Sequence, residues 1–234
     1  MRQKKLHNQN PQEKNHQRIN RLDFYEKSRY SNSMIGFKDY IYEREEGAGL
    51  TIWDIDETLF NTKALIYVMK GGELVRKLSN QEFNTYKLGA GESFDFREFR
   101  DAKHFRDTSE PIAKAINKLI AIHKNVKAKG SKMIVITARA DFDDRDMFLD
   151  TLRKQGIDID DIHVHRAGNL NAPNSAEGKK IYIKQYLDTG KYARVRLFDD
   201  AISNLEMLKG LAKEYPNIKF EPYLAHHDGT MTKY

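Results

Sequence analysis

The 234-residue sequence contains no cysteine. A disulfide framework, a thiolate zinc site and a cysteine nucleophile are therefore excluded. The sequence also lacks any run that approaches the roughly 18 apolar residues of a membrane span, and its amino terminus has no apolar signal-peptide core. These absences agree with a reducing compartment. We expect a soluble cytoplasmic protein that is not exported through a signal peptide and has no membrane contact.

What is present is enough for a folded protein with a strongly polar surface. Hydrophobic residues make up 39% of the chain, with 12 Tyr and 12 Phe among them, and charged residues make up 32%. A chain of 27.3 kDa can form one domain with an insertion or two small domains. We favour one domain.

Basic charge gathers at the amino terminus. The net charge of the chain is +6, and residues 1–22 contain the single acid Glu13. The basic residues of this segment are Arg2, Lys4, Lys5, Lys14, Arg18 and Arg21. With few apolar neighbours, they predict a disordered arm that either neutralises the phosphates of a nucleic-acid partner or acts as a solubilising tail. Aromatic residues of 23–46 could dock onto the domain as a lead-in helix or strand, and we place the arm at 1–46 and a domain at 47–234.

A short apolar strand, Leu50 to Trp53, runs directly into two acids. Side chains alternate along an extended backbone, so we expect Asp54 and Asp56 to point the same way while Ile55 turns into the core. Two aligned carboxylates repel each other unless a cation, a shared proton or solvent offsets the repulsion. A solvated acidic turn is the alternative reading of this pair taken alone.

Residues of about 60–107 are predicted to form a small insertion that projects over the acidic pair. Residues 66–76 consist of two strand-like runs around Gly71-Gly72, which is typical of a hairpin. Residues 79–88 can form a short helix capped by Ser79 or Asn80. Aromatic and basic side chains then interleave at Phe94, Phe96, Arg97, Phe99, Arg100, Lys103, Phe105 and Arg106. They could stack bases and hold phosphates, or they could simply form packed core.

Helices and strands alternate in the remainder of the chain. We expect helices at about 110–126, with Pro111 in the first turn, and at 143–155, 179–187 and 203–214, and strands at 133–136, 162–165, 195–198 and 218–224. This alternation predicts an α/β fold, in which a parallel sheet is covered by helices on both faces. Ligands of such sheets bind at the carboxyl ends of the strands.

Polar side chains converge on those carboxyl ends. They are Asp54 and Asp56 after the first strand, Thr137 and Arg139 after the second, and Asp199 and Asp200 after the fourth. Four carboxylates together need a hard divalent cation, and oxygen ligands favour Mg²⁺. With a hydroxyl, a lysine at 179 or 180 and a carboxylate nucleophile, they indicate a phosphoryl-transfer site.

The order of these motifs resembles that of the haloacid dehalogenase-like (HAD) phosphatase superfamily. The matching segments are Asp54-Ile55-Asp56-Glu57-Thr58, Ile134-Val135-Ile136-Thr137, a lysine at 179 or 180, and Leu197-Phe198-Asp199-Asp200. The resemblance covers residues 50 to about 225. It implies a Rossmann-like three-layer domain with strand order 5-4-1-2-3 and a small cap inserted after the first motif.

The resemblance also implies a role for each residue. Asp54 is expected to be the nucleophile that becomes an aspartyl-phosphate, and Asp56 the general acid and then the base. Mg²⁺ is expected on the Asp54 carboxylate, the Asp56 backbone carbonyl and Asp200, with Asp199 as an orienting residue or an alternative ligand. Thr137 and a lysine are expected to bind the phosphoryl oxygens. Of the two adjacent lysines we favour Lys180 over Lys179. Arg139 is expected to contact the phosphorylated substrate or to pair with one of the acids Asp141, Asp143, Asp144 and Asp146, whose other expected role is helix capping.

The lysine spacing and the Thr137-Ala138-Arg139 turn are similar to those of the 3'-phosphatase domain of phage polynucleotide kinases, and the chain also resembles deoxyribonucleotidases. The sequence contains no P-loop, so kinase activity is not implied. The expectation is a Mg²⁺-dependent phosphomonoesterase for nucleotides or 3'-phosphorylated nucleic-acid ends, in a phage protein that works in the host cytoplasm. A nucleic-acid-binding protein that retains the fold and a phosphatase for a small metabolite or a phosphoprotein are the alternatives.

Histidines offer a further, separate possibility. His163 and His165 share one face of a predicted strand, and His226 and His227 lie close to the carboxyl end of the chain. They could mark a metal site, but strand and tail histidines are more often structural, and no third ligand has a fitting spacing.

Overall fold

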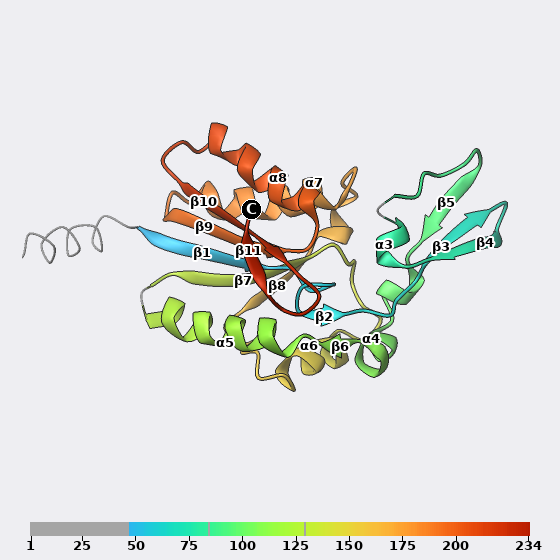
Figure 1. Ribbon diagram of the computed structural model, residues 1–234, viewed down its shortest axis with the longest axis horizontal. Helices are drawn as coiled ribbons and strands as arrows, with labels where there is room; N and C mark the ends of the chain where they lie inside the picture. Colours follow the sequence, from blue (N-terminus) through green and yellow to red (C-terminus); the bar gives the residue numbers. More distant parts are fainter. Residues whose placement is uncertain (1–46, 84, 129) are drawn as a thin grey trace, which may run out of the picture. The chain divides into compact units, whose positions relative to one another are not determined.

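The central sheet has six strands in the order β11-β10-β9-β1-β7-β8 (Figure 1). The strands are β1 (Ala48–Trp53), β7 (Lys132–Thr137), β8 (His163–Arg166), β9 (Tyr192–Asp199), β10 (Lys219–Ala225) and β11 (Met231–Lys233). All neighbours pair in parallel except β10 and β11. Counted along the chain, the five parallel strands follow the order 5-4-1-2-3. The predicted parallel α/β fold is confirmed.

This computed structural model describes residues 47–83, 85–128 and 130–234. The predicted basic arm and its aromatic continuation, residues 1–46, lie outside the described residues. Within the described part, no helix is long and apolar enough to cross a membrane.

Helices cover both faces of the sheet, in three layers (Figure 1). They are α5 (Ala113–Ala128) and α6 (Arg145–Arg153) on one face, and α7 (Ser175–Leu187) and α8 (Ile202–Gly210) on the other. Successive side chains along each strand point to opposite faces of the sheet, so the same strands contribute to a hydrophobic core on each face. Trp53 and Val135 pack toward α5 and α6, whereas Ile52 and Ile134 pack toward α7 and α8. Short 3₁₀ turns, η2 (Ala167–Leu170) and η3 (Leu211–Lys213), follow β8 and α8.

The residues between β1 and α5 form a second, smaller sheet, and we call residues 62–101 the cap. A two-residue ladder of β2 (Phe60–Asn61) and β6 (Glu110–Pro111) brackets this insertion. The cap strands are β3 (Ile66–Lys70), β4 (Glu73–Leu78) and β5 (Glu92–Asp95), in the antiparallel order β4-β3-β5. The helical pieces are α3 (Asn80–Phe83), η1 (Arg97–Phe99) and α4 (Ala102–Thr108). The hairpin predicted around Gly71-Gly72 is confirmed, and both glycines adopt positive φ.

The aromatic residues of the insertion are mostly core. Phe94 and Phe99 pack against the buried Ile66 and Val68 of β3, and Phe105 is fully buried in the main core. Phe96 is the exception, with 40% of its surface exposed. Packing therefore accounts for most of this stripe.

Several predicted helix ends were wrong. Pro111 lies in the strand β6 rather than in a helical turn, and α5 begins at Ala113, because the Ile112 amide donates to the Leu59 carbonyl (2.8 Å) and ties this segment to the β2 loop. The helix expected at 79–88 ends at Phe83. Its start is a capping box in which the Ser79 amide donates to Glu82 (2.8 Å) and the Glu82 amide donates to the Ser79 hydroxyl (3.3 Å). The strand β11 was not predicted.

Candidate active site

The first strand delivers Asp54 to the carboxyl edge of the sheet. The Asp54 amide donates to the Phe198 carbonyl of β9 (3.0 Å), which continues the parallel ladder one residue beyond β1. The residue is almost fully buried, at 4% exposure, and Ile55 is buried in the core as predicted. Asp54 therefore lies beside the end of β9, where Asp199 and Asp200 follow.

Lys179 links the acids of the first and fourth strands. Its Nζ donates to Asp54 Oδ1 (2.7 Å) and to Asp199 Oδ2 (2.7 Å), and the whole residue is 1% exposed. The helix α7 that carries it begins at Ser175, with the Asn174 side chain accepting from the Glu177 amide (2.9 Å). One lysine thus joins two buried carboxylates at the centre of the cluster.

The preference for Lys180 over Lys179 was wrong. Lys180 lies on the helix surface, 3.8 Å from Glu177, with 31% of its side chain exposed. Adjacent helical residues point in directions about 100° apart, so only one of the two can face the sheet. Lys179, Ile183 and Leu187 repeat at a spacing of four, and Ile183 and Leu187 are core residues. This inward stripe was the sequence signal for Lys179.

Asp199 and Asp200 differ in their surroundings. Asp199 is fully buried, and its Oδ1 accepts from the Ala201 amide (3.0 Å) and the Asn204 amide group (2.8 Å), while Oδ2 accepts from Lys179. Asp200 is partly exposed. Sequence reasoning missed Asn204, which stands in the first turn of α8. Asp199 therefore fits an orienting role, and Asp200 has the freer carboxylate.

The cluster carries more negative than positive charge. Burial raises the pKa of Asp54 well above its ordinary value; Lys179 lowers it, and the charges of Asp199 and Asp200 raise it again. Burial also raises the pKa of Asp200 to about 7, with a further contribution from Asp199. Burial alone lowers the pKa of Lys179, but the two aspartates outweigh it and hold that pKa above its ordinary value.

Carboxylate oxygens of Asp54, Asp199 and Asp200 lie within 4.8 Å of one another. When all three acids are ionised, one lysine leaves an excess of negative charge, which a cation offsets. All of the donors are oxygens, the ligands that Mg²⁺ prefers. The residues present therefore fit the predicted metal.

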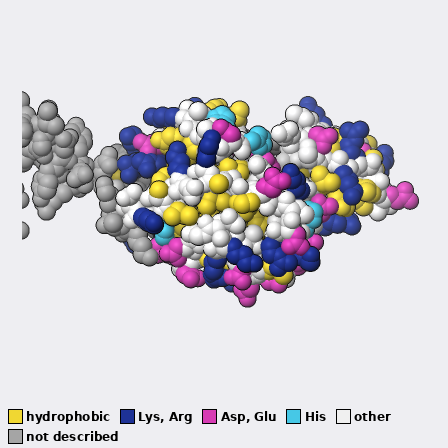
Figure 2. Space-filling view, turned by 60° about the horizontal axis from the view of Figure 1, so that its bottom comes forward, with side chains coloured by type: hydrophobic (Ala, Val, Ile, Leu, Met, Phe, Trp, Pro, Cys, Tyr) yellow, Lys and Arg dark blue, Asp and Glu magenta, His cyan; other side chains and the backbone are white. Residues whose placement is uncertain are grey.

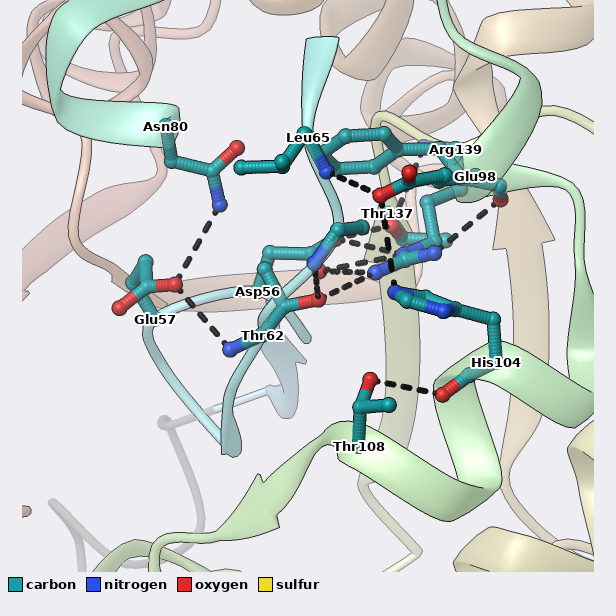
Figure 3. Close-up of polar contacts among 12 residues, drawn as sticks. Asp56, Glu57, Thr62, Leu65, Asn80, Glu98, His104, Thr108, Thr137 and Arg139 are labelled. Carbon is teal, nitrogen blue, oxygen red and sulfur yellow. Dashed lines mark hydrogen bonds and ion pairs between the residues drawn. The ribbon is translucent and has the colours of Figure 1, made fainter. Parts of the chain in front are cut away.

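Asp56 is held by Arg139 rather than by this cluster (Figure 3). Arg139 Nη2 donates to Asp56 Oδ1 (2.7 Å), and Nε lies 3.1 and 3.0 Å from the two carboxylate oxygens. Nη1 donates to the Phe99 carbonyl (3.1 Å), and Nη2 also donates to Thr62 Oγ1 (2.9 Å). The rings of Phe99 and Phe105 lie 4.5 and 4.8 Å from the guanidinium. Arg139 is thus fixed on all sides.

The expected pairing of Arg139 with one of the acids that follow it was therefore wrong. Its side chain is 1% exposed and its three nitrogens donate to Asp56, Phe99 and Thr62, while its expected contact with the substrate stays a prediction. It also pairs with none of the acids that follow it in the chain. Of these, Asp144 caps α6 by accepting from the Met147 amide (2.9 Å), which confirms the capping interpretation at that residue.

Thr137 is the last residue of β7. It lies between the cluster around Lys179 and the Asp56–Arg139 pair. It is fully buried, its hydroxyl oxygen accepts from the Arg139 amide (3.1 Å), and that oxygen lies 3.5 Å from Asp56 Oδ2. The turn after it packs tightly against the loop after β8, where the Gly168 amide donates to the Arg139 carbonyl (3.2 Å). The predicted residues except Lys180 therefore meet at one edge of the sheet.

The histidines do not join the site as a metal centre. His165 Nε2 lies 2.8 Å from the Tyr186 hydroxyl, and His226 Nε2 lies 2.9 Å from the Thr232 hydroxyl. A different group, His123 with Asp158 and Asp161, has metal-like spacing, but His123 Nε2 lies 2.7 Å from Asp161, the distance of an ion pair. These acids precede β8, at the edge of the sheet opposite to Asp54.

No family model matches the chain, and no curated protein is similar to its sequence. Among solved structures, the chain is similar to the HAD domain of the effector protein Lem4 from Legionella pneumophila. The two are 15% identical, the match covers 76% of this chain and 85% of that chain, and the TM-score is 0.42. A likeness this weak assigns neither a family nor an activity.

Proposed function

We propose that the protein is a Mg²⁺-dependent phosphomonoesterase that works through an aspartyl-phosphate on Asp54. The observation that carries the proposal is Lys179, buried between Asp54 and Asp199 at the carboxyl edge of a parallel sheet. A buried lysine can neutralise both a nucleophilic carboxylate and the phosphoryl oxygens that approach it. The order of the motifs along the chain gives independent support.

The side chains suit a two-step displacement. Asp54 Oδ1 accepts from Lys179, while no described residue donates to Oδ2. That oxygen can attack phosphorus, forming the phosphorus–oxygen bond as the bond to the leaving oxygen breaks. A proton from Asp56 passes to the leaving oxygen; Asp56 then takes a proton from the water that attacks the aspartyl-phosphate, releasing phosphate and restoring Asp54. Oδ1 of Asp56 accepts from both Nη2 and Nε of Arg139, whereas Oδ2 accepts from Arg139 through the shared Nε alone, so the proton transfer is assigned to Oδ2.

The Asp54 and Asp200 carboxylates and the Asp56 backbone carbonyl are the groups proposed to hold Mg²⁺. When bound, the ion supplies neutralisation of charge on the reacting phosphoryl group. Asp199, with both oxygens occupied, keeps Lys179 in place rather than binding the ion. Thr137 is proposed to bind a phosphoryl oxygen.

Nucleotides or 3'-phosphorylated nucleic-acid ends are the proposed substrates. The motif resemblance and the basic segment 1–22 support this choice, and the exposed Phe96 beside Arg97 offers a ring on which a base can stack. On the face of the described residues seen in Figure 2, Lys and Arg side chains are mixed with Asp and Glu rather than gathered in one basic patch. The charge on this face therefore favours a short substrate or a strand end over a long duplex.

Two experiments test the proposal. Wild type and Asp54→Asn are compared on an activated aryl phosphate with Mg²⁺, and equal rates would remove Asp54 as the nucleophile. A panel of mononucleotides, 3'- and 5'-phosphorylated oligonucleotides, sugar phosphates and phosphopeptides then ranks substrates by kcat/KM. A clear preference for a sugar phosphate or a phosphopeptide would contradict the nucleotide assignment and leave the chemistry standing.

A further inference from the structure

Glu57, the residue after Asp56, has an unusual backbone. Its φ is +57°, in the left-handed region, and among the described residues only Asn171 shares a positive φ without being glycine. Glycine adopts this conformation freely, whereas a side chain makes it unfavourable. A glutamate here indicates that its carboxylate makes contacts that offset the strain.

Those contacts join three separate segments, and Figure 3 shows two of them, to Thr62 and to Asn80. Glu57 Oε1 accepts from the Thr62 amide at the start of the cap (3.2 Å) and from Asn80 Nδ2 in α3 (3.3 Å). Oε2 lies 3.0 Å from His227 Nδ1, in the loop between β10 and β11. Only 13% of the Glu57 side chain is exposed. The Glu57 carboxylate therefore connects the loop after β1, which carries Asp56, to the cap and to the loop between β10 and β11.

Thr62 extends this link back to the acid. Its hydroxyl accepts from Arg139 Nη2 (2.9 Å), and the same nitrogen donates to Asp56 Oδ1 (2.7 Å). Because Asp56 and Glu57 are adjacent in the chain, the contacts form a closed ring: Asp56, Glu57, Thr62, Arg139 and again Asp56. A second cap contact, the Phe99 carbonyl, accepts from Arg139 Nη1 (3.1 Å).

We infer that Glu57 is a positioning residue that couples the placement of the cap, through Asn80 and Thr62, to the orientation of the Asp56 carboxylate. The inference rests on the proposed function, because it assigns Asp56 a proton transfer. The cap then does more than cover the site. Its contacts with Glu57 and Arg139 fix the orientation of the Asp56 carboxylate. Loss of this coupling impairs the step that needs a well-placed proton.

The readout is the dependence of rate on the leaving group. Glu57→Gly removes the carboxylate and its contacts but relieves the backbone strain, so the two effects on stability oppose each other, and a purely structural role predicts no selective effect on the reaction. Positioning predicts a fall in kcat/KM of about 10-fold or more on an alkyl phosphate, whose leaving oxygen needs a proton, but at most about twofold on an activated aryl phosphate, because kcat/KM reports the first step and not the later attack of water that also uses Asp56. Asn80→Ala should show the same pattern more weakly.

Rescue and non-additivity sharpen the test. Glu57→Gln keeps an oxygen that can accept from Thr62 and Asn80, so it should recover most of the alkyl phosphate rate lost in Glu57→Gly. In an Asp56→Asn background, Glu57→Gly should have no further effect, because the group that it positions is gone. Glu73→Gln, an exposed glutamate beside the cap hairpin turn, is the matched control and should leave both rates unchanged.

Circular dichroism and thermal unfolding establish that each variant is folded. The inference would be overturned if the folded Glu57→Gly and Asn80→Ala proteins lost activity equally on the alkyl and the aryl phosphate, or lost none on either. Hydrolysis by the wild type would still leave the proposed function intact. Wild-type protein that hydrolyses no phosphomonoester with Mg²⁺ would overturn the proposed function and this inference with it.

Discussion

Lys179 donates to Asp54 over 2.7 Å while both residues are almost completely withdrawn from water. A buried carboxylate and a buried ammonium are each unfavourable alone, and each compensates the other. Asp199 accepts from the same nitrogen, so the lysine has two partners and its removal leaves two buried acids.

Lys179→Met should therefore damage both activity and stability. Loss of a buried, charged donor predicts a fall in kcat of about 100-fold or more, and two uncompensated acids predict a loss of about 3 kcal/mol in the free energy of unfolding. Lys180→Met is the matched control because that lysine is on the surface. Steady-state kinetics and urea unfolding of both variants measure the difference; a Lys180 variant that loses as much would refute this assignment.

Arg139→Lys should not preserve function. A lysine has no fork with which to hold both oxygens of Asp56, and it cannot reproduce the simultaneous contacts to Thr62 and Phe99. We expect about a 10-fold or larger loss in kcat/KM on alkyl phosphates and a smaller loss in kcat/KM on activated aryl phosphates. Rates on both ester types measure this; an increase in KM with unchanged kcat would instead indicate direct substrate binding by Arg139.

Gly168→Ala should disturb the site from outside it. A Cβ at this position would lie 2.6 Å from both the Ala138 carbonyl oxygen and the Ala140 amide nitrogen, closer than any real contact. The turn that carries Arg139 must shift, so both the melting temperature and kcat should fall. Gly210→Ala is the control, since a Cβ there meets nothing within 4 Å and its backbone is helical. Equal melting temperatures for the two variants would show that the loops tolerate the shift.

Stability should depend on His165 at mildly acidic pH. Burial, and then the charge of His163, lower the pKa of His165 from 6.5 to about 4. Between these values the unfolded chain binds a proton that the folded protein does not, so the free energy of unfolding falls as pH drops from about 6.5 to 4. In His165→Gln this contribution is absent. Urea unfolding at pH 7 and pH 4.5 should show a smaller decrease for the variant, and an identical decrease would contradict the shift.

The strand ends were predictable because burial and periodicity are local. Apolar runs such as Met133 to Ile136 identified the parallel strands, and parallel strands necessarily bring their carboxyl ends to one edge. Asp54, Thr137 and Asp199 followed from that rule alone. The spacing of Lys179 from Ile183 and Leu187 indicates the correct lysine, but the choice of Lys180 followed the similarity of its spacing to Asp199 with that of the phage 3'-phosphatase domain.

The Asp56–Arg139 pair could not be predicted in the same way. It depends on how closely the turn after β7 approaches the loop after β1, and on the rings of Phe99 and Phe105, which are set by packing between distant segments. Glu57 was equally hidden, because its left-handed backbone is visible only in three dimensions. The three-residue strand β11 is too short to show a pattern.

Trapping the covalent intermediate tests the central claim most directly. Asp56→Asn keeps the nucleophile but lacks the base for the second step, so reaction with an activated aryl phosphate and Mg²⁺ should leave phosphate on the enzyme. After acid quenching and proteolysis, mass spectrometry should find one phosphoryl group on the peptide that contains Asp54, and none after the further change Asp54→Asn. Release of the aryl alcohol with no phosphoryl group on Asp54, or with one on another residue, would contradict the account.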